Sequence, residues 1–313
     1  MDQSDNASRY AEMNADLARI HVTRNDDAKL LAKFSLQAAV ARYLYLTDAE
    51  NQALALCDSN TRHLKRGHLL ASEGGDDPSP YFVNGGLMHS SVRTGSGKRQ
   101  IINFHSAGEM IGLSSMACTR AVHTLTAVSD CLVTPISLRE LGQLFESQPR
   151  IAGFLYAIAA ANGVVMNDRV TVIGKSSARQ RVGWFLLDIL ARLRITDGFH
   201  TNLLNLPLSQ SDIADAVGLT KVHVNRTFRQ LDSTGTIERL GRQIRIIDEQ
   251  ALISETGYTD RYARMASHWM ANPQESEGQD RTELERRSGT GERSAPVVAA
   301  GLLGDVAREG VSR

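Results

Sequence analysis

The residues of this chain with the most specific chemistry lie on one polar face between positions 220 and 230. In the major groove of DNA, arginine and lysine can bind guanine and asparagine can bind adenine. Arg226, Asn225 and Lys221 are therefore candidates for base contacts, and Val222 beside them could contact a thymine methyl group. Phosphates are bound by basic and hydroxyl side chains. The candidates for phosphate contacts are Thr220, His223, Arg229, Arg242 and Arg245.

Two short helices joined by a tight turn must position these side chains. Ser209 and Asp212 are close to a capping box, so we expect a first helix to begin there and to end at Gly218. Thr220 can cap a second helix. Apolar residues recur at helical spacing along both, namely Ile213, Ala214, Val217, Val224, Phe228 and Leu231. The pattern predicts a helix-turn-helix, with glycine in the turn.

A predicted β-hairpin follows the second helix. Residues 236–240 and 243–247 flank Gly241 and Arg242, a pattern typical of two strands around a glycine turn. This hairpin would form the wing of a winged helix. The alternative is a small packed helical subdomain with a solvated basic face. The ordered spacing of small, glycine, apolar and basic positions favours DNA binding over that alternative.

Charge is balanced over the whole chain but concentrated in this region. The 313 residues carry 35 basic and 35 acidic side chains, which argues against a general nucleic-acid binder of the histone type. Over 219–247 only Asp232 and Glu238 oppose six basic residues. Those six are Lys221, Arg226, Arg229, Arg239, Arg242 and Arg245. The basic side chains therefore gather where DNA would bind.

Cysteine content and hydropathy indicate the compartment. Cys57, Cys118 and Cys131 are odd in number and contain no CxxC pair, so we expect neither a disulfide framework nor a zinc ribbon. A reducing cytoplasm fits this content. We expect no membrane span, because no apolar run approaches about 20 residues, and the polar N-terminus lacks a signal-peptide core.

The first half of the chain predicts a β-rich domain over 30–148, after a polar N-terminal arm over 1–29. Short helices are expected over 30–34 and 48–56, the second of them capped by Thr47. Short apolar runs separated by Gly, Asp, Pro and Ser then predict the strands of a sandwich or barrel. The expected strands cover 68–71, 81–83, 87–92, 100–104, 125–128 and 131–136, with a hairpin tip over 94–99.

A long helix is predicted over 149–174, between Pro149 and Gly174. Apolar residues along it repeat at steps of four and three, the spacing of a coiled-coil seam. The seam residues proposed for dimerisation are Ile151, Leu155, Ile158, Asn162 and Val165. The alternative is a single helix that lies on the sandwich. Dimerisation is favoured because a short recognition helix binds DNA specifically when it is doubled across two half-sites.

The rest of the chain divides into a winged-helix domain over 175–250 and a tail over 251–313. An amphipathic helix over 179–194 should pack on the helix-turn-helix, and Ser176 with Ser177 should form the hinge before it. Beyond Asp248 we expect a short helix. From Asn272 the composition of Pro, Gly, Ser, Arg and Glu predicts disorder.

This order of parts resembles the Crp/Fnr superfamily of bacterial transcription regulators over about residues 30–248. The resemblance rests on Gly86, the hairpin before Arg99, the turn over 108–112, the long helix and the terminal winged helix. It implies an α+β chain with a cyclic-nucleotide-binding-type β-roll, or jelly roll, a dimerisation helix and a C-terminal winged helix-turn-helix. It also implies a homodimer on a palindromic operator in double-stranded DNA, and contact with RNA polymerase.

The effector pocket and the recognition helix depart from the family pattern. Cyclic-nucleotide-binding members carry a Glu after the Gly112-type turn and an Arg-Ser pair further on, but Leu113 and Ser114 occupy the first position here. The possible pocket residues are Gly108, Glu109, Gly112, Leu113, Ser114, Arg120 and His123. Family members commonly pair a Glu with an Arg four residues later in the recognition helix, whereas Val222 precedes Arg226 here. We therefore expect a different half-site and no cyclic nucleotide.

No other cofactor is predicted. The N-terminal cysteines that would hold an iron-sulfur cluster are absent. Haem ligation through His68, His89, His105 or His123 is disfavoured, because a lone histidine is more often structural. We find no metal-spaced His/Glu set and no phosphate-binding glycine loop, so we expect no enzyme. A different class of function is a metabolite- or cyclic-nucleotide-responsive sensor whose winged helix binds protein. The effector, the operator sequence and the direction of regulation stay open.

Overall fold

The structure is a computed structural model that describes residues 34–57, 60–197, 201–241 and 243–262. The N-terminal arm over 1–29, the tail beyond 262 and Arg242 lie outside these residues, so the expectations for them stay predictions. All described residues belong to one compact unit of the chain.

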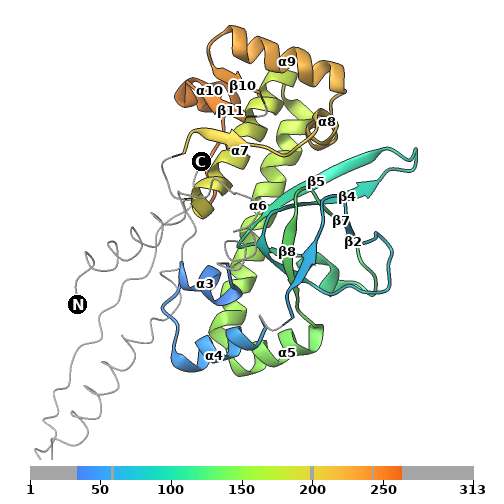
Figure 1. Cartoon of the computed structure of the whole chain (residues 1–313), viewed down its shortest axis with the longest axis vertical. Helices are drawn as coiled ribbons and strands as arrows, with labels where there is room; N and C mark the ends of the chain where they lie inside the picture. Colours follow the sequence, from blue (N-terminus) through green and yellow to red (C-terminus); the bar gives the residue numbers. More distant parts are fainter. Residues whose placement is uncertain (1–33, 58–59, 198–200, 242, 263–313) are drawn as a thin grey trace, which may run out of the picture. The chain divides into compact units, whose positions relative to one another are not determined.

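Two four-stranded antiparallel sheets form the expected β-roll (Figure 1). One sheet has the order β1 (Arg62–Leu64), β8 (Cys131–Pro135), β3 (Tyr81–Gly85) and β6 (Met110–Ile111). The other has the order β2 (Leu69–Ala71), β7 (Thr124–Ala127), β4 (Leu87–Arg93) and β5 (Arg99–Ser106). All six expected strands are present. The short strands β1 and β6 were not predicted, because two or three residues show no alternation.

Apolar side chains fill the space between the sheets. The buried cluster there includes Tyr81, Val83, Met88, Ile111, Leu125, Cys131 and Val133. The hairpin tip over 94–99 is confirmed, since the Thr94 amide donates to the Lys98 carbonyl at 2.9 Å. Gly97 adopts a φ of 77° in that turn, a conformation that glycine reaches without strain.

Three short helices, α3 (Leu36–Ala41), α4 (Asp48–Cys57) and α5 (Leu138–Ser147), pack on the outer side of the roll. Of the helix expected over 30–34, the structure describes only Phe34. Phe34 is not helical, so this end of the prediction was wrong, and α3 begins at Leu36. Ser35 sets this start by accepting a hydrogen bond from the Ala38 amide at 3.0 Å. The Thr47 cap of α4 is confirmed, since its hydroxyl accepts from the Glu50 amide at 3.2 Å.

The long helix α6 (Pro149–Lys175) continues one residue past Gly174, the predicted end. Ser176 ends it in an extended conformation, and α7 (Ala178–Asp197) begins two residues later. The break between the two helices therefore lies at the predicted hinge.

The proposed dimer seam faces the interior of the same chain. Ile151 and Leu155 are buried among α3, α4 and α5, and Val165 is buried in a second cluster with α7. Ile158 and Asn162 are half-buried on the same side. Ile151, Leu155 and Val165 are therefore not available for a dimer contact, and assigning these three residues to it was wrong. The assignment of Ile158 and Asn162 stays a prediction. A 3.5-residue repeat reveals a buried stripe but does not say which surface covers it.

The opposite side of α6 is exposed and mostly apolar. Tyr156, Val164 and Val170 are exposed large side chains, and Ala160 and Gly163 are exposed between them. This helix is long and apolar enough, by length and composition, to cross a membrane. The expectation that no segment of the chain would be was therefore wrong. One such helix is weak evidence for a membrane. An apolar helix face of this kind also suits contact with another protein chain.

The remaining elements form the predicted winged helix. After α7 come β9 (Leu203–Asn205), α8 (Gln210–Val217), α9 (Lys221–Ser233), β10 (Ile237–Leu240), β11 (Gln243–Ile246) and α10 (Glu249–Thr256). The wing is a three-stranded sheet of order β10-β11-β9, so β9 adds a strand that was not predicted. One apolar cluster joins α7, α8 and α9 to Ile101 and Phe104 of β5. Figure 1 shows α8 beside β5.

Candidate nucleic-acid interface

Both helices of the helix-turn-helix begin at the predicted caps. The Ser209 hydroxyl accepts from the Asp212 amide at 3.1 Å while Asp212 accepts from the Ser209 amide at 2.9 Å, which completes a capping box. Gly218 ends α8 with a φ of 66°, in the left-handed region. Thr220 caps α9 by accepting from the His223 amide at 3.3 Å. The local sequence therefore fixes the start of the candidate recognition helix.

The base-reading candidates lie on the exposed side of α9. Val222 is 76% exposed, although it is apolar. Lys221 and Arg226 are exposed, and Asn225 is half-buried. Val224, Thr227, Phe228 and Leu231 are buried on the opposite side. Packing thus turns the predicted polar face outward.

A hollow on this face brings several of the candidates together. It is lined by Val222, His223, Asn225, Arg226, Arg229, Gln230 and Ser233. Among the described residues, Arg226 and Arg229 have no ion-pair partner. Lys221 lies outside the hollow, on the first turn of α9. Two guanidinium groups without partners are therefore free to bind an anionic or hydrogen-bonding ligand.

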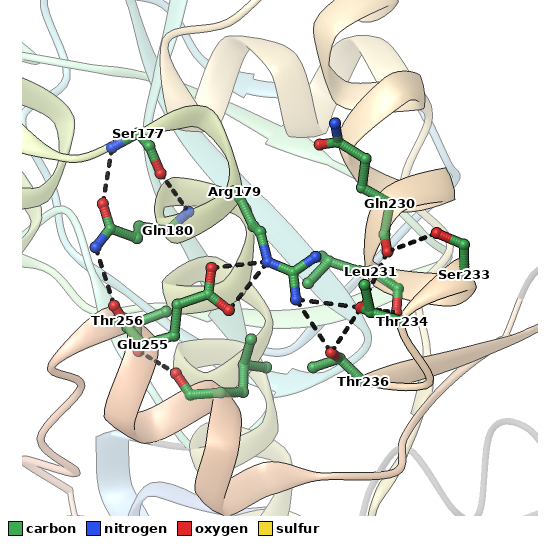
Figure 2. Close-up of polar contacts among 11 residues, drawn as sticks. Ser177, Arg179, Gln180, Gln230, Leu231, Ser233, Thr234, Thr236, Glu255 and Thr256 are labelled. Atoms are coloured by element: carbon green, nitrogen blue, oxygen red, sulfur yellow. Dashed lines mark hydrogen bonds and ion pairs between the residues drawn. The ribbon is translucent and has the colours of Figure 1, made fainter.

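The C-terminal end of α9 is held by Arg179, which sequence reasoning did not identify. Figure 2 shows its side chain between α7, α9 and α10. Its Nε lies 2.7 Å from Glu255 Oε1, and its Nη2 donates to the Thr234 and Thr236 hydroxyls at 3.2 and 3.1 Å. Because Arg179 lies three residues after the helix break at Ser176, the start of α7 and the end of α9 are tied together.

The wing offers fewer free cations than the sequence suggested. Arg245 pairs with Glu238 directly across the hairpin, with Nη1 and Oε2 2.7 Å apart. Arg239 lies over the Phe228 ring at 5.9 Å. A phosphate would therefore compete with Glu238 for Arg245, whereas Arg229 has no such competitor among the described residues.

Three arginines hold the winged helix on strand β5. Arg99 of β5 lies 2.6 Å from Asp212 and 2.7 Å from Asp215 of α8. Arg169 of α6 donates to the carbonyls of Ile102 at 2.5 Å and Ala216 at 3.2 Å. Arg169 and Ala216 are 47 positions apart in the sequence, so this contact joins distant segments of the chain.

Arg192 of α7 is the third and most buried of these arginines. It donates to the Phe104 carbonyl at 2.5 Å and to Asn103 Oδ1 at 2.8 Å. It also lies 3.4 Å from Asp188 and 3.3 Å from Glu109. The sequence carried one signal for it, an Asp and an Arg four residues apart within an apolar helix.

The structure does not gather the possible effector residues into one pocket. Arg120 is exposed and lies 3.6 Å from Asp76, so assigning it to a pocket was wrong. Ser114 is exposed, and Leu113 packs on the cluster outside the roll. Burial and the charge of His105 lower the pKa of the half-buried His123.

Gly108 and Glu109 line a cavity elsewhere, between α3, α6 and α7. Burial alone would raise the pKa of Glu109, but Arg192 and His105 lower it to about 2. Glu109 therefore serves as the ionised partner of Arg192. Gly112 adopts a φ of 78°, and its Cα hydrogens face the backbone of Ser79 and Pro80, where a Cβ would come within 3.3 Å.

A cyclic nucleotide does not fit the residues inside the roll. Its phosphate would need a fixed guanidinium and its ribose a hydrogen-bond acceptor. Arg120 points to the surface, and apolar side chains occupy the interior. Among the described residues, no three His, Cys, Asp or Glu side chains are grouped to hold a metal ion. Cys57 and Cys131 are buried, and Cys118 is exposed.

Comparison with known proteins identifies both parts of the chain. Residues 61–148 match the model of the cyclic nucleotide-binding domain, and residues 180–255 match the Crp-like helix-turn-helix domain. The nitrogen fixation regulation protein FixK of Azorhizobium caulinodans is 32% identical over 182 residues, which cover 57% of this chain and 73% of that protein. The transcriptional activator protein FnrA of Stutzerimonas stutzeri is 29% identical over 196 residues, which cover 63% of this chain and 80% of that protein.

Solved structures agree with this assignment. The structure of FixK2 from Bradyrhizobium japonicum is 26% identical to this chain, with a TM-score of 0.58, and the match covers 64% of this chain and 98% of that one. The regulator CLP of Xanthomonas campestris, at 17% identity and a TM-score of 0.52, shares the fold. The chain therefore belongs to the Crp/Fnr family of transcription regulators and carries their helix-turn-helix DNA-binding domain.

Proposed function

We propose that this regulator binds a palindromic operator in double-stranded DNA as a homodimer, with α9 of each protomer in the major groove. The observation that carries the proposal is the hollow on α9, where Arg226 and Arg229 have no ion-pair partner among the described residues. A recognition helix of 13 residues reads only a few base pairs, so two copies are needed for a specific site.

Arg226 is the best candidate for a base contact. It lies four residues after Val222, so the two side chains are neighbours on α9. A guanidinium binds guanine O6 and N7, whereas valine can contact only a thymine methyl group. The half-site should therefore keep a guanine and differ from half-sites in which a Glu accepts from cytosine. Lys221 and Asn225 flank this pair as further base-reading candidates.

Selection of DNA from a random pool, followed by binding measurements, tests the proposal. We expect Arg226→Ala to weaken binding to the selected operator by about 2 kcal/mol, roughly thirtyfold, and to remove the preference at one base position. Arg139→Ala, which removes an exposed arginine from α5, is the control and should bind as the parent protein does. If selection retained no sequence, a protein-binding role for the winged helix would replace the proposal.

Salt dependence separates the phosphate contacts from the base contacts. Arg229→Ala should weaken binding to all sequences and reduce the slope of log K against log salt by about one. Arg245→Ala should change the slope less, because Glu238 already holds that guanidinium. Titrations of one operator at several salt concentrations give both slopes. Equal losses for the two variants would contradict the pairing seen across the wing.

The exposed side of α6 is the proposed dimer contact. It presents Tyr156, Val164 and Val170 with small residues between them, so that two copies of the helix could approach closely. We expect Val164→Arg to dissociate the dimer at micromolar concentration and to weaken operator binding, measured by analytical ultracentrifugation and by titration. Leu56→Arg, at an exposed apolar residue of α4, should leave the dimer intact. A dimeric Val164→Arg protein would exclude this face.

The family relatives and the interior of the roll support three further parts of the proposal, which concern RNA polymerase, the cellular location and bound cofactors. We infer contact with RNA polymerase and a cytoplasmic location from the transcriptional activators among the relatives. The roll holds no cyclic nucleotide, haem or iron-sulfur cluster in this proposal, because its interior is filled with apolar side chains and the phosphate-binding arginine is displaced. Equilibrium dialysis with cyclic AMP would show binding if this part is wrong.

A further inference from the structure

A cavity separate from the interior of the roll lies where the sensor domain meets the DNA-binding domain. Its walls come from α3, α6, the turn over 106–110 and α7. Its volume is about 100 Å³, and it opens to solvent on one side. Small-molecule sites in proteins often lie at domain boundaries.

The walls of this cavity are mainly apolar. They include Leu36, Phe82, Phe154, Leu155, Ile158 and Val165. Polar side chains interrupt them, namely Arg42, Tyr43, Ser106, Glu109, Asn162, Arg192, Arg261 and Tyr262. Apolar walls with polar groups at some positions are the composition of a site that orients a mostly apolar ligand.

Arg42 is the only arginine of the cavity without an ion-pair partner among the described residues. Arg192 lies 3.3 Å from Glu109, and Arg261 lies 2.7 Å from Asp168. Arg42 instead lies over the Phe34 ring at 5.1 Å. Burial lowers the pKa of its guanidinium, and the neighbouring Tyr43 offsets this effect only in part. A half-buried cation without a counter-ion favours an anion beside it.

We propose that this cavity binds a small organic carboxylate with an apolar body, and that the carboxylate pairs with Arg42. The planar guanidinium matches a carboxylate through two parallel hydrogen bonds. One unpaired cation suits a ligand with one negative charge, and the apolar walls suit a hydrocarbon chain or an aromatic ring. A phosphate-rich ligand would find too few donors, since Arg192 and Arg261 are already paired.

The position of the cavity gives this ligand contact with both domains. Arg42 and Tyr43 precede the roll, while Arg192 and Ile195 belong to α7 of the DNA-binding domain. A Cβ added at Gly108 would come within 3.3 Å of Arg42 Nη1, so Arg42 lies against the turn that carries Glu109. The ligand would therefore sit next to the Glu109 and Arg192 pair that holds the two domains together.

Isothermal titration of the full-length protein without DNA tests the proposal independently of operator binding. The probes are decanoate and 2-naphthoate, each compared with its neutral amide, decanamide or naphthamide. We expect at least one carboxylate to bind with a Kd below about 100 µM, and its amide to bind at least about tenfold more weakly. Binding of neither carboxylate, or equal binding of acid and amide, would overturn the proposal.

Two variants locate the binding site. Arg42→Met removes the guanidinium but keeps an apolar stem, and should weaken carboxylate binding about tenfold or more while the amide is unaffected. Arg139→Met, at an exposed arginine outside the cavity, should change neither. Ala161→Phe should fill the space and block both probes. Unchanged carboxylate binding in both Arg42→Met and Ala161→Phe would place the ligand elsewhere and refute the site.

Discussion

Replacing Arg192 with methionine is expected to lower the free energy of unfolding by about 3–5 kcal/mol. The Arg192 and Asp188 side chains are each 5% exposed, and Arg192 also contacts Glu109 on the roll. Removing one member of a buried pair leaves its partner as an uncompensated charge. The variant would also leave the Phe104 carbonyl and the Asn103 amide oxygen without their donor. Urea unfolding at neutral pH measures the loss.

Arg194→Met is the matched control on the same helix. Arg194 pairs with Glu249 at 2.7 Å, but these side chains are 24% and 29% exposed. Water screens such a pair, so its loss should cost about 1 kcal/mol or less. Similar losses for the two variants would mean that the burial of Arg192 adds nothing to its effect.

Arg192→Met should also change how the free energy of unfolding depends on pH. Arg192 and His105 outweigh burial and hold the pKa of Glu109 at about 2, below its ordinary value of 4.5. A carboxylate with a lowered pKa stabilises the fold above its unfolded pKa, and this contribution is lost as the pH falls through the folded value. The parent protein should therefore lose stability between about pH 4.5 and about pH 2, and Arg192→Met should lose less of it.

Local signals in the sequence were enough to predict the DNA-binding helices. Ser209 and Thr220 cap their helices through contacts within three residues, and Gly218 occupies the left-handed turn that the pattern requires. Such contacts depend on neighbours in sequence, so they can be derived without the fold. The hairpin tip over 94–99 was predicted for the same reason.

Contacts between distant segments could not be predicted in this way. The seam of α6 was correctly identified as a buried stripe, but its partners proved to be the chain's own α3 and α7. Arg169 and Arg192 find their acceptors on β5, about seventy and ninety positions away. Periodicity gives the side of a helix that is buried, whereas tertiary structure decides what lies against it. The cavity beside Arg42 is likewise visible only when α3, α6 and α7 meet.

Acidification is expected to destabilise the contact between the roll and α8 through His89. His89 is buried on β4, and Arg99 Nη1 lies 3.4 Å from its Nε2, so this nitrogen accepts and the ring is neutral. Burial and the positive charge of Arg99 lower the pKa of His89 from 6.5 to about 4, with a smaller contribution from His105. Asp212 and Asp215 oppose this effect but do not outweigh it.

The sign of the effect follows from proton binding. Between the folded value of about 4 and the ordinary value of 6.5, the unfolded chain binds a proton that the folded chain excludes. Stability therefore falls as the pH falls, by about 3 kcal/mol between about pH 7 and about pH 4 for this residue. Protonation would also place a second positive charge beside Arg99, which holds α8 on the roll.

His89→Gln should remove most of this dependence, because the amide oxygen can accept from Arg99 but does not titrate over this range. Part of the slope should remain, since burial also lowers the pKa of His123. His63→Gln, at an exposed histidine of β1, is the control and should keep the slope of the parent protein. The free energy of unfolding, measured in urea from about pH 7 to about pH 4, gives the slopes. If the His89→Gln and parent curves ran parallel, His89 would not be the titrating group, and the loss of stability in acid would have to arise from other titratable side chains.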